Sequence, residues 1–112
     1  MAAVQHTTMA SSVRIAVLSL LIACGSKARA PVTHQVDIRA MQFVPATLTV
    51  AVGDTVVWTN RDVVPHTVTA VGSFDSLMIE GGRQWEHVVT HAGETPYGCT
   101  FHPTMLAKLI AR

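Results

Sequence analysis

Charged side chains are scarce in this sequence, and neither sign dominates. Asp, Glu, Lys and Arg together make up 13% of the 112 residues, and the formal net charge is +1. A chain that is 49% apolar has too much hydrophobic material for intrinsic disorder. The basic stripe that a phosphate backbone requires is also missing, so we expect no nucleic acid among the partners.

Apolar runs long enough to cross a bilayer are missing as well. The main run, residues 15–23 after Arg14, is too short for a membrane-spanning helix. Its length and the preceding positive charge are typical of an export signal. We therefore expect residues 1–23 to be a signal peptide and the protein to act outside the cytoplasm, in the periplasm or at the cell surface. Met9 would serve equally well as the initiator, because residues 1–8 add no positive charge.

The apolar run ends at Leu21-Ile22-Ala23-Cys24-Gly25, which resembles the lipobox of bacterial lipoproteins. The resemblance implies that Cys24 becomes the first mature residue and carries acyl chains, with residues 24–33 as a tether to the membrane. An ordinary signal peptidase site after Ala30 is the competing interpretation, although the Pro31 that follows disfavours cleavage there. We expect a membrane-anchored lipoprotein.

Short alternating runs fill residues 34–112, which we expect to form one domain. In residues 47–52, Leu48, Val50 and Val52 share one face, which is the period of a half-buried strand. Clusters of Gly, Asn and Asp separate the runs and favour turns. This pattern predicts an all-β sandwich or barrel, with strands in residues 36–38, 47–52, 55–60, 66–71, 74–79, 83–89, 95–99 and 108–110.

Near the C-terminus, three potential metal ligands follow one another at intervals of three residues: Cys99, His102 and Met105. This spacing can place a thiolate, an imidazole and a thioether around one point on a tight loop. His66 lies far upstream and must be brought to them by the fold. Two His, one Cys and a weak axial Met form the ligand set of blue-copper electron-transfer sites.

Cys99 would be the only thiol of the exported protein if Cys24 is acylated or removed. An unpaired thiol outside the cytoplasm needs an explanation, and metal binding supplies one because a coordinated thiol is held as thiolate. Zinc is a competing ion. However, a thioether is a poor zinc ligand, and structural zinc sites are usually closed by Cys or His. We therefore expect one type I copper ion as the cofactor.

Several ordered motifs between Met41 and Met105 closely resemble the cupredoxins, above all the amicyanin-like and plastocyanin-like members. They are Met41-Gln42-Phe43-Val44-Pro45, Val52-Gly53-Asp54-Thr55-Val56-Val57-Trp58-Thr59-Asn60, Pro65-His66-Thr67, Phe74-Asp75-Ser76 and Tyr97-x-Cys99-x-x-His102-Pro103-x-Met105. The resemblance implies an eight-stranded Greek-key sandwich with copper under the loops at one end. This sequence departs from the family pattern at Thr67, where relatives usually carry Asn, so the hydrogen bonds that brace the ligand loop are expected to differ. It also departs at Ala107, where Gly is common, and there the entry to the strand is expected to bend differently.

The same resemblance implies a role for each ligand. His66, Cys99 and His102 would form the strong trigonal set, Met105 would be the axial ligand, and His102 would lie at the protein edge as the electron port. We therefore expect a monomer that shuttles single electrons through Cu(I)/Cu(II), docking a donor and then an acceptor redox protein near His102. An enzyme would need a second copper site or an open coordination position, and only one complete ligand set is found. Copper capture or delivery at the cell surface, with the same site, is the alternative function.

Overall fold

The structure is a computed structural model that describes residues 1–4, 12 and 29–112. Cys24 and most of the predicted signal peptide lie outside these residues. No helix in the described part is long and apolar enough to cross a membrane. The regular elements there are nine strands: β1 (Thr33–Arg39), β2 (Gln42–Val44), β3 (Thr47–Val50), β4 (Thr55–Asn60), β5 (Thr69–Ala70), β6 (Phe74–Asp75), β7 (Gln84–Val88), β8 (Gly93–Cys99) and β9 (His102–Ala111).

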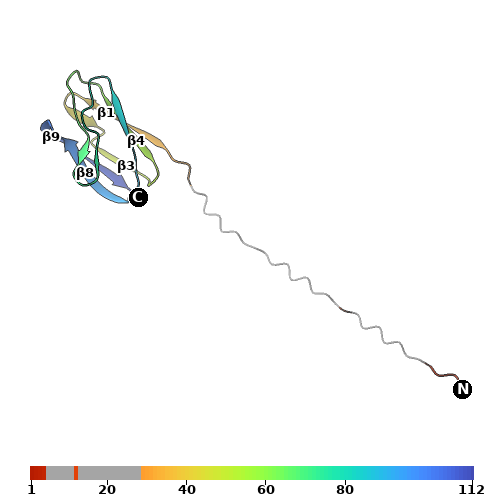
Figure 1. Ribbon diagram of the computed structural model, residues 1–112. Coiled ribbons are helices and arrows are strands. Elements are labelled where there is room, and N and C mark those ends of the chain that lie inside the picture. The colour runs from red at the N-terminus through yellow and green to blue at the C-terminus, as the bar shows by residue number, and fades with distance from the viewer. Residues whose placement is uncertain (5–11, 13–28) are drawn as a thin grey trace.

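The strands form two sheets that pack face to face as a sandwich (Figure 1). The four-stranded sheet has the order β2-β1-β4-β7, and the five-stranded sheet has the order β3-β9-β8-β5-β6. The pairs β1–β4 and β3–β9 are parallel, and the remaining pairs are antiparallel. The predicted all-β, cupredoxin-like sandwich is confirmed.

The strand count is nine rather than eight, and several boundaries differ from the sequence-based ones: β1 and β9 are longer than expected, whereas β5 and β6 are shorter. Gln42–Val44 forms β2, a strand too short to show an alternating pattern, by pairing with β1 across a tight turn. Residues 66–71 were expected to be one strand, but only Thr69–Ala70 is. In this segment the Val68 N–H donates to the Ser76 hydroxyl at 2.7 Å, and the Val68 carbonyl accepts from the Ser76 N–H at 3.0 Å. Val68 is therefore hydrogen-bonded to a loop instead of a strand.

Aromatic side chains hold the two sheets together. Trp58 on β4 is fully buried, and its ring centroid lies 5.6 Å from that of Tyr97 on β8 and 6.0 Å from that of Phe74 on β6. The Trp58 indole N–H donates to the Tyr97 hydroxyl at 3.2 Å. Burial raises the pKa of Tyr97 to about 12, so this phenol stays protonated at ordinary pH. The core therefore sits between β4 and β8, the strands that lead to the ligand loops.

At one end of the sandwich, the buried carboxylate of Asp54 binds several residues at the start of the domain. It accepts two hydrogen bonds from Arg29 Nη2, both at 2.8 Å, and one from the Val32 N–H at 3.0 Å. The His34 ring at 2.8 Å and the Ala51 N–H at 3.0 Å complete its partners. Two residues of the predicted tether, Arg29 and Val32, thus bind the domain directly. We call this region the Asp54 end.

The parallel strands β1 and β4 both start at the Asp54 end and run to the opposite end of the sandwich. The Thr55 N–H donates to the Val32 carbonyl where the two strands begin, and the Arg61 N–H donates to the Ile38 carbonyl where they finish. At about 3.3 Å per residue, such strands separate the two ends by roughly 20 Å. The loops that follow β4 carry His66, so we call this opposite region the ligand end.

Candidate metal centre

Backbone and side-chain hydrogen bonds fix the position of His66 at the ligand end. The residue is fully buried, and it exchanges two backbone hydrogen bonds with Ile79, at 3.1 and 2.7 Å. The Asn60 amide, at the end of β4, donates to the Val64 carbonyl at 2.8 Å and to the Ile79 carbonyl at 3.0 Å. The loop around His66 is therefore tied both to the strand before it and to the segment it faces.

Cys99 ends β8 and His102 begins β9, on either side of the tight turn that joins the two strands. They form the last pair of this antiparallel ladder, and the register shifts between Gly98 and Cys99. A Cβ atom on Gly98 would lie 2.7 Å from the Met105 carbonyl oxygen, so no larger residue fits there without moving β9. The absence of a side chain at position 98 lets the two strands approach closely where the ligands are.

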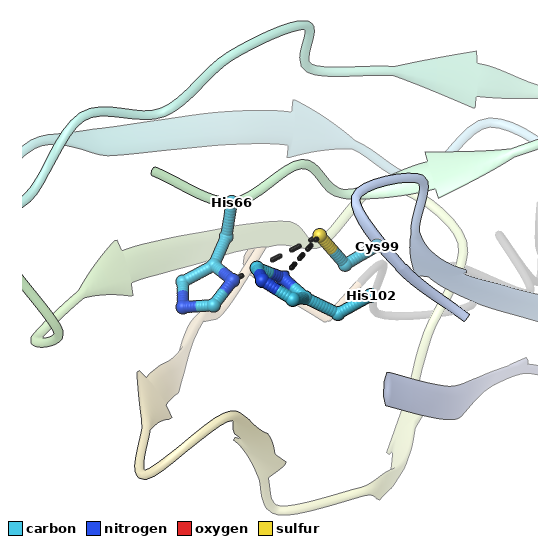
Figure 2. A group of neighbouring side chains, drawn as sticks. All are labelled: His66, Cys99 and His102. Atoms are coloured by element: carbon cyan, nitrogen blue, oxygen red, sulfur yellow. Dashed lines mark hydrogen bonds between the residues drawn. The ribbon is translucent and has the colours of Figure 1, made fainter. Parts of the chain in front are cut away.

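The fold brings the three strong ligands together, as Figure 2 shows. The Cys99 Sγ atom lies 3.8 Å from His66 Nδ1 and 3.5 Å from His102 Nδ1, and the three donor atoms are all within 4.8 Å of one another. A trigonal ion with bonds of about 2.0 Å to an imidazole nitrogen and about 2.3 Å to a thiolate sulfur separates these atoms by roughly 3.7 Å. The donors are therefore spaced as one trigonal metal ion requires.

Asp62 orients the His66 ring from behind. Its carboxylate lies 2.8 Å from His66 Nε2 and accepts the backbone N–H groups of Ala40 at 2.7 Å and Met41 at 3.0 Å. Because a carboxylate only accepts, Nε2 carries the hydrogen and Nδ1 presents its lone pair toward Cys99. Burial works to raise the pKa of Asp62, but the Met41 N–H, the His66 ring and the Ala40 N–H outweigh it and lower the pKa.

The role of Asp62 is not predicted by the sequence, in which Asp62 belongs to one of the Asn- and Asp-containing clusters that favour turns. Its spacing of four residues before His66 was the available signal. The two N–H donors could not have been foreseen. They come from a two-residue turn in which Ala40 and Met41 adopt left-handed φ values of 49° and 61°, as the tight turns of hairpins require.

Thr67 connects the two ligand loops. Its backbone N–H donates to Cys99 Sγ at 3.3 Å, and its hydroxyl accepts the Thr100 N–H at 2.9 Å. A hydrogen bond to the sulfur stabilises the thiolate and holds the Cys99 side chain in place. The threonine at the position where an asparagine is common therefore still provides hydrogen bonds between the loops.

A comparison with protein families identifies residues 30–111 as a match to the copper-binding proteins of the plastocyanin/azurin family. The chain belongs to the plastocyanin/azurin family. Amicyanin of Paracoccus denitrificans is 36% identical to this family member over 81 residues, covering 67% of the chain and 62% of the relative. The chloroplastic plastocyanin of Tetradesmus obliquus is 31% identical over 125 aligned positions, covering 99% of the chain and 84% of the relative.

Solved structures of amicyanin superimpose on the same region. The oxidised state of one amicyanin mutant matches with a TM-score of 0.69 and 34% identity, covering 71% of this chain and 82% of that one. A reduced amicyanin mutant gives a TM-score of 0.69 and 32% identity over 75% of this chain and 86% of that one. The chain spans less than two thirds of the curated amicyanins it matches, at 62% and 61% of their lengths.

In this member of the plastocyanin/azurin family, the type I copper site consists of His66, Cys99, His102 and Met105. Met105 lies on β9 and is 3% exposed, in the same hydrophobic cluster as Cys99. His102 is half-buried, whereas His66 is fully buried and Cys99 is 4% exposed. Of the four ligands, His102 is thus the one whose side chain reaches the surface.

Proposed function

We propose that this protein is a non-enzymatic, monomeric electron carrier that works outside the cytoplasm through reversible Cu(I)/Cu(II) chemistry. The observation that carries the proposal is the trigonal spacing of the His66, Cys99 and His102 donor atoms on a β-sheet frame. The copper ion supplies the one-electron change. The chain keeps the donors fixed, through Asp62 on one side and Thr67 on the other, so that little has to move when the charge of the site changes.

Copper loading followed by visible and electron paramagnetic resonance spectroscopy tests this proposal. The wild-type protein should show intense visible absorption and a reversible one-electron couple. Cys99→Ser should lose the absorption, because the colour requires the thiolate bond to copper. His91→Gln, in an exposed side chain bonded only to Thr90 among the described residues, is the matched control and should keep it. A Cys99→Ser protein with unchanged colour and reversibility would overturn the proposal.

The alternative function, copper delivery at the cell surface, fits the site less well. Delivery requires an acceptor to replace the ligands one by one, and three of the four are at most 4% exposed. Fast copper transfer to an acceptor apoprotein, together with negligible electron self-exchange, would favour delivery. Fast self-exchange with retention of copper would favour electron transfer.

The surface around His102 suits brief docking of redox partners. Phe101 is 49% exposed, Met78 is 55% exposed and Val64 is 40% exposed, and all three adjoin ligand-bearing segments. A small apolar surface of this kind permits fast association and fast release. Phe101→Glu should therefore slow electron self-exchange and leave the visible spectrum unchanged. Val52→Glu, in a side chain that is 46% exposed at the Asp54 end, is the control; equal slowing by both variants would argue against docking near His102.

We also propose that Cys24 is acylated and anchors the protein to a membrane, as the lipobox-like residues before it suggest. Arg29 follows Cys24 by five positions, a reach of at most about 18 Å, and Arg29 binds Asp54. The anchor would thus hold the Asp54 end near the bilayer and leave the ligand end facing away. Cys24→Ser should release the protein from membranes, and Cys99→Ser should not. A mature N-terminus at Pro31 in mass spectrometry would contradict the anchor.

A further inference from the structure

A series of hydroxyl groups runs from the ligand loops to the edge of the five-stranded sheet. Thr67 Oγ1 lies 2.9 Å from Thr69 Oγ1, and Thr69 Oγ1 donates to Asp75 Oδ1 at 3.1 Å. On its other side, Thr67 Oγ1 lies 2.9 Å from the Thr100 nitrogen and 3.2 Å from Thr100 Oγ1. These four residues form one connected network, which we call the threonine chain.

Strand pairing holds the outer part of the threonine chain in place. Thr69 on β5 pairs with Asp75 on β6 and with Gly98 on β8, the residue immediately before the thiol ligand. The Leu77 N–H donates to the same Asp75 oxygen that Thr69 contacts, at 2.9 Å. Asp75 is exposed, so the threonine chain leads from a solvent-facing carboxylate to the buried site.

The chemistry of these groups sets the direction of each hydrogen bond. A hydroxyl has one hydrogen and two lone pairs, and a carboxylate has only acceptors. Thr69 must therefore donate to Asp75 and accept from Thr67. Thr67, having donated its only hydroxyl hydrogen, presents two lone pairs to the N–H and O–H of Thr100. All four contacts are satisfied together in this direction alone.

We propose that Asp75 is a positioning residue for the copper site, because its carboxylate orients the threonine chain so that Thr67 accepts from Thr100. This acceptance and the Thr67 N–H bond to Cys99 Sγ together tie the loop of His66 to the loop of Cys99. Without the carboxylate, Thr69 can donate to Thr67 instead, and the Thr67 hydrogen then turns toward Thr100 Oγ1. Thr67 Oγ1 must then divide its lone pairs between the Thr69 hydroxyl and the Thr100 N–H, so the hydrogen bond that connects the two loops weakens. The inference rests on copper binding by this site.

Hydrogen exchange of the metal-free, full-length protein tests the threonine chain directly. Thr69→Val removes the connecting hydroxyl while keeping the side-chain shape, and Asp75→Ala removes the terminal acceptor. Each variant should speed exchange of the Thr100 amide by about two- to tenfold, the equilibrium change expected for one lost hydrogen bond. The Val57 amide, in the four-stranded sheet, should exchange as in the wild type, which separates a local change from general destabilisation. Thr69→Ser restores the hydroxyl and should restore Thr100 protection.

Copper-loaded protein gives a second readout that a purely structural role of Asp75 would not change. Both Thr69→Val and Asp75→Ala should shift the visible thiolate–copper band, and the double variant should show no larger shift than either single one, because both act on one chain. Additive shifts, or unchanged Thr100 exchange and an unchanged band in both single variants, would overturn the inference. Failure of the wild type to bind copper would instead overturn the copper assignment, which the metal-free exchange measurement does not depend on.

Discussion

Asp62 is not a metal ligand, but its carboxylate orients the ligand His66. Asp62→Ala removes the acceptor that keeps the hydrogen of His66 on Nε2. We expect affinity for Cu(II) to fall by about 10- to 100-fold, the usual effect of removing a partner that orients a metal ligand. Competition with a chelator of known affinity measures the loss.

Asp37 provides the matched control for that measurement. It lies on β1, and its side chain contacts Gln35 and Arg61 but none of the four ligands among the described residues, so Asp37→Ala should leave copper affinity unchanged. An equal loss of affinity in both variants would show that the effect comes from general electrostatics or stability. An unchanged affinity in Asp62→Ala would show that the backbone of the His66 loop alone sets the ring position.

The ligands themselves were predictable from the sequence, and their supporting residues were not. Cys99, His102 and Met105 are close in the chain, and their residue types limit the choice of metal. The supporting roles of Asp62 and Thr69 could not be predicted, because each depends on a contact with another segment. For Asp62 this segment is the turn at Ala40, and for Thr69 it is β6. Residue types reveal donor chemistry, whereas hydrogen-bond partners depend on strand register.

The turn between β3 and β4 makes the stability of the domain depend on pH. The N–H groups of Val32 and Ala51, followed by His34 and Arg29, lower the pKa of Asp54 far below its usual 3.8. Because the folded pKa is the lower one, the unfolded chain binds more protons in acid, and stability falls as the pH drops below about 4. Above that range the contribution of Asp54 is fully present.

Asp54→Asn tests this linkage. Denaturant unfolding at pH 7 and at pH 3 should show that the variant is less stable than the wild type at pH 7 and loses less of its stability in acid. Asp37→Asn, in a more exposed carboxylate, serves as the control and should keep most of the acid dependence of the wild type. A parallel pH dependence in the wild type and Asp54→Asn would contradict the assignment.

The sequence predicted which segments form strands better than it predicted where each strand begins and ends. β4 and most of β8 were found because short runs of strand-forming residues between turn residues are a strong signal. The two-residue strands β5 and β6 were overextended, since loop segments rich in Val, Thr and Ile have the composition of strands. Their real limits are set by Ser76 and Ile79, which bind Val68 and His66 across the loop.

Trp58 links the two sheets, so its loss should affect the whole molecule. Trp58→Ala removes contacts with Tyr97 and Phe74 in the opposite sheet and leaves a cavity. We expect the free energy of unfolding to fall by about 3–5 kcal/mol, measured by chemical denaturation. Trp85→Ala, at a half-buried position beside it, should cost less; an equal cost would show that Trp58 is not the central contact.

Copper should stabilise the folded protein as a whole, because the four ligands are assembled only in the fold. At a free copper concentration one hundred times Kd, the gain is about 2.7 kcal/mol, and Tm rises by roughly 4–8 °C per kcal/mol for a domain of this size. Thermal unfolding with and without copper measures the shift, and a chelator should reverse it. Cys99→Ser should show a much smaller increase; an equal increase would place copper elsewhere.

The distance between the Asp54 end and the ligand end has an evolutionary consequence. Sites that lie more than about 10 Å apart and share no partner contribute to stability independently, and β1 and β4 separate these two ends by roughly 20 Å. Selection can therefore act on each end alone. A lineage can change the residues that close the Asp54 end, or those that surround the metal ligands, without inheriting a compromise at the far side of the molecule.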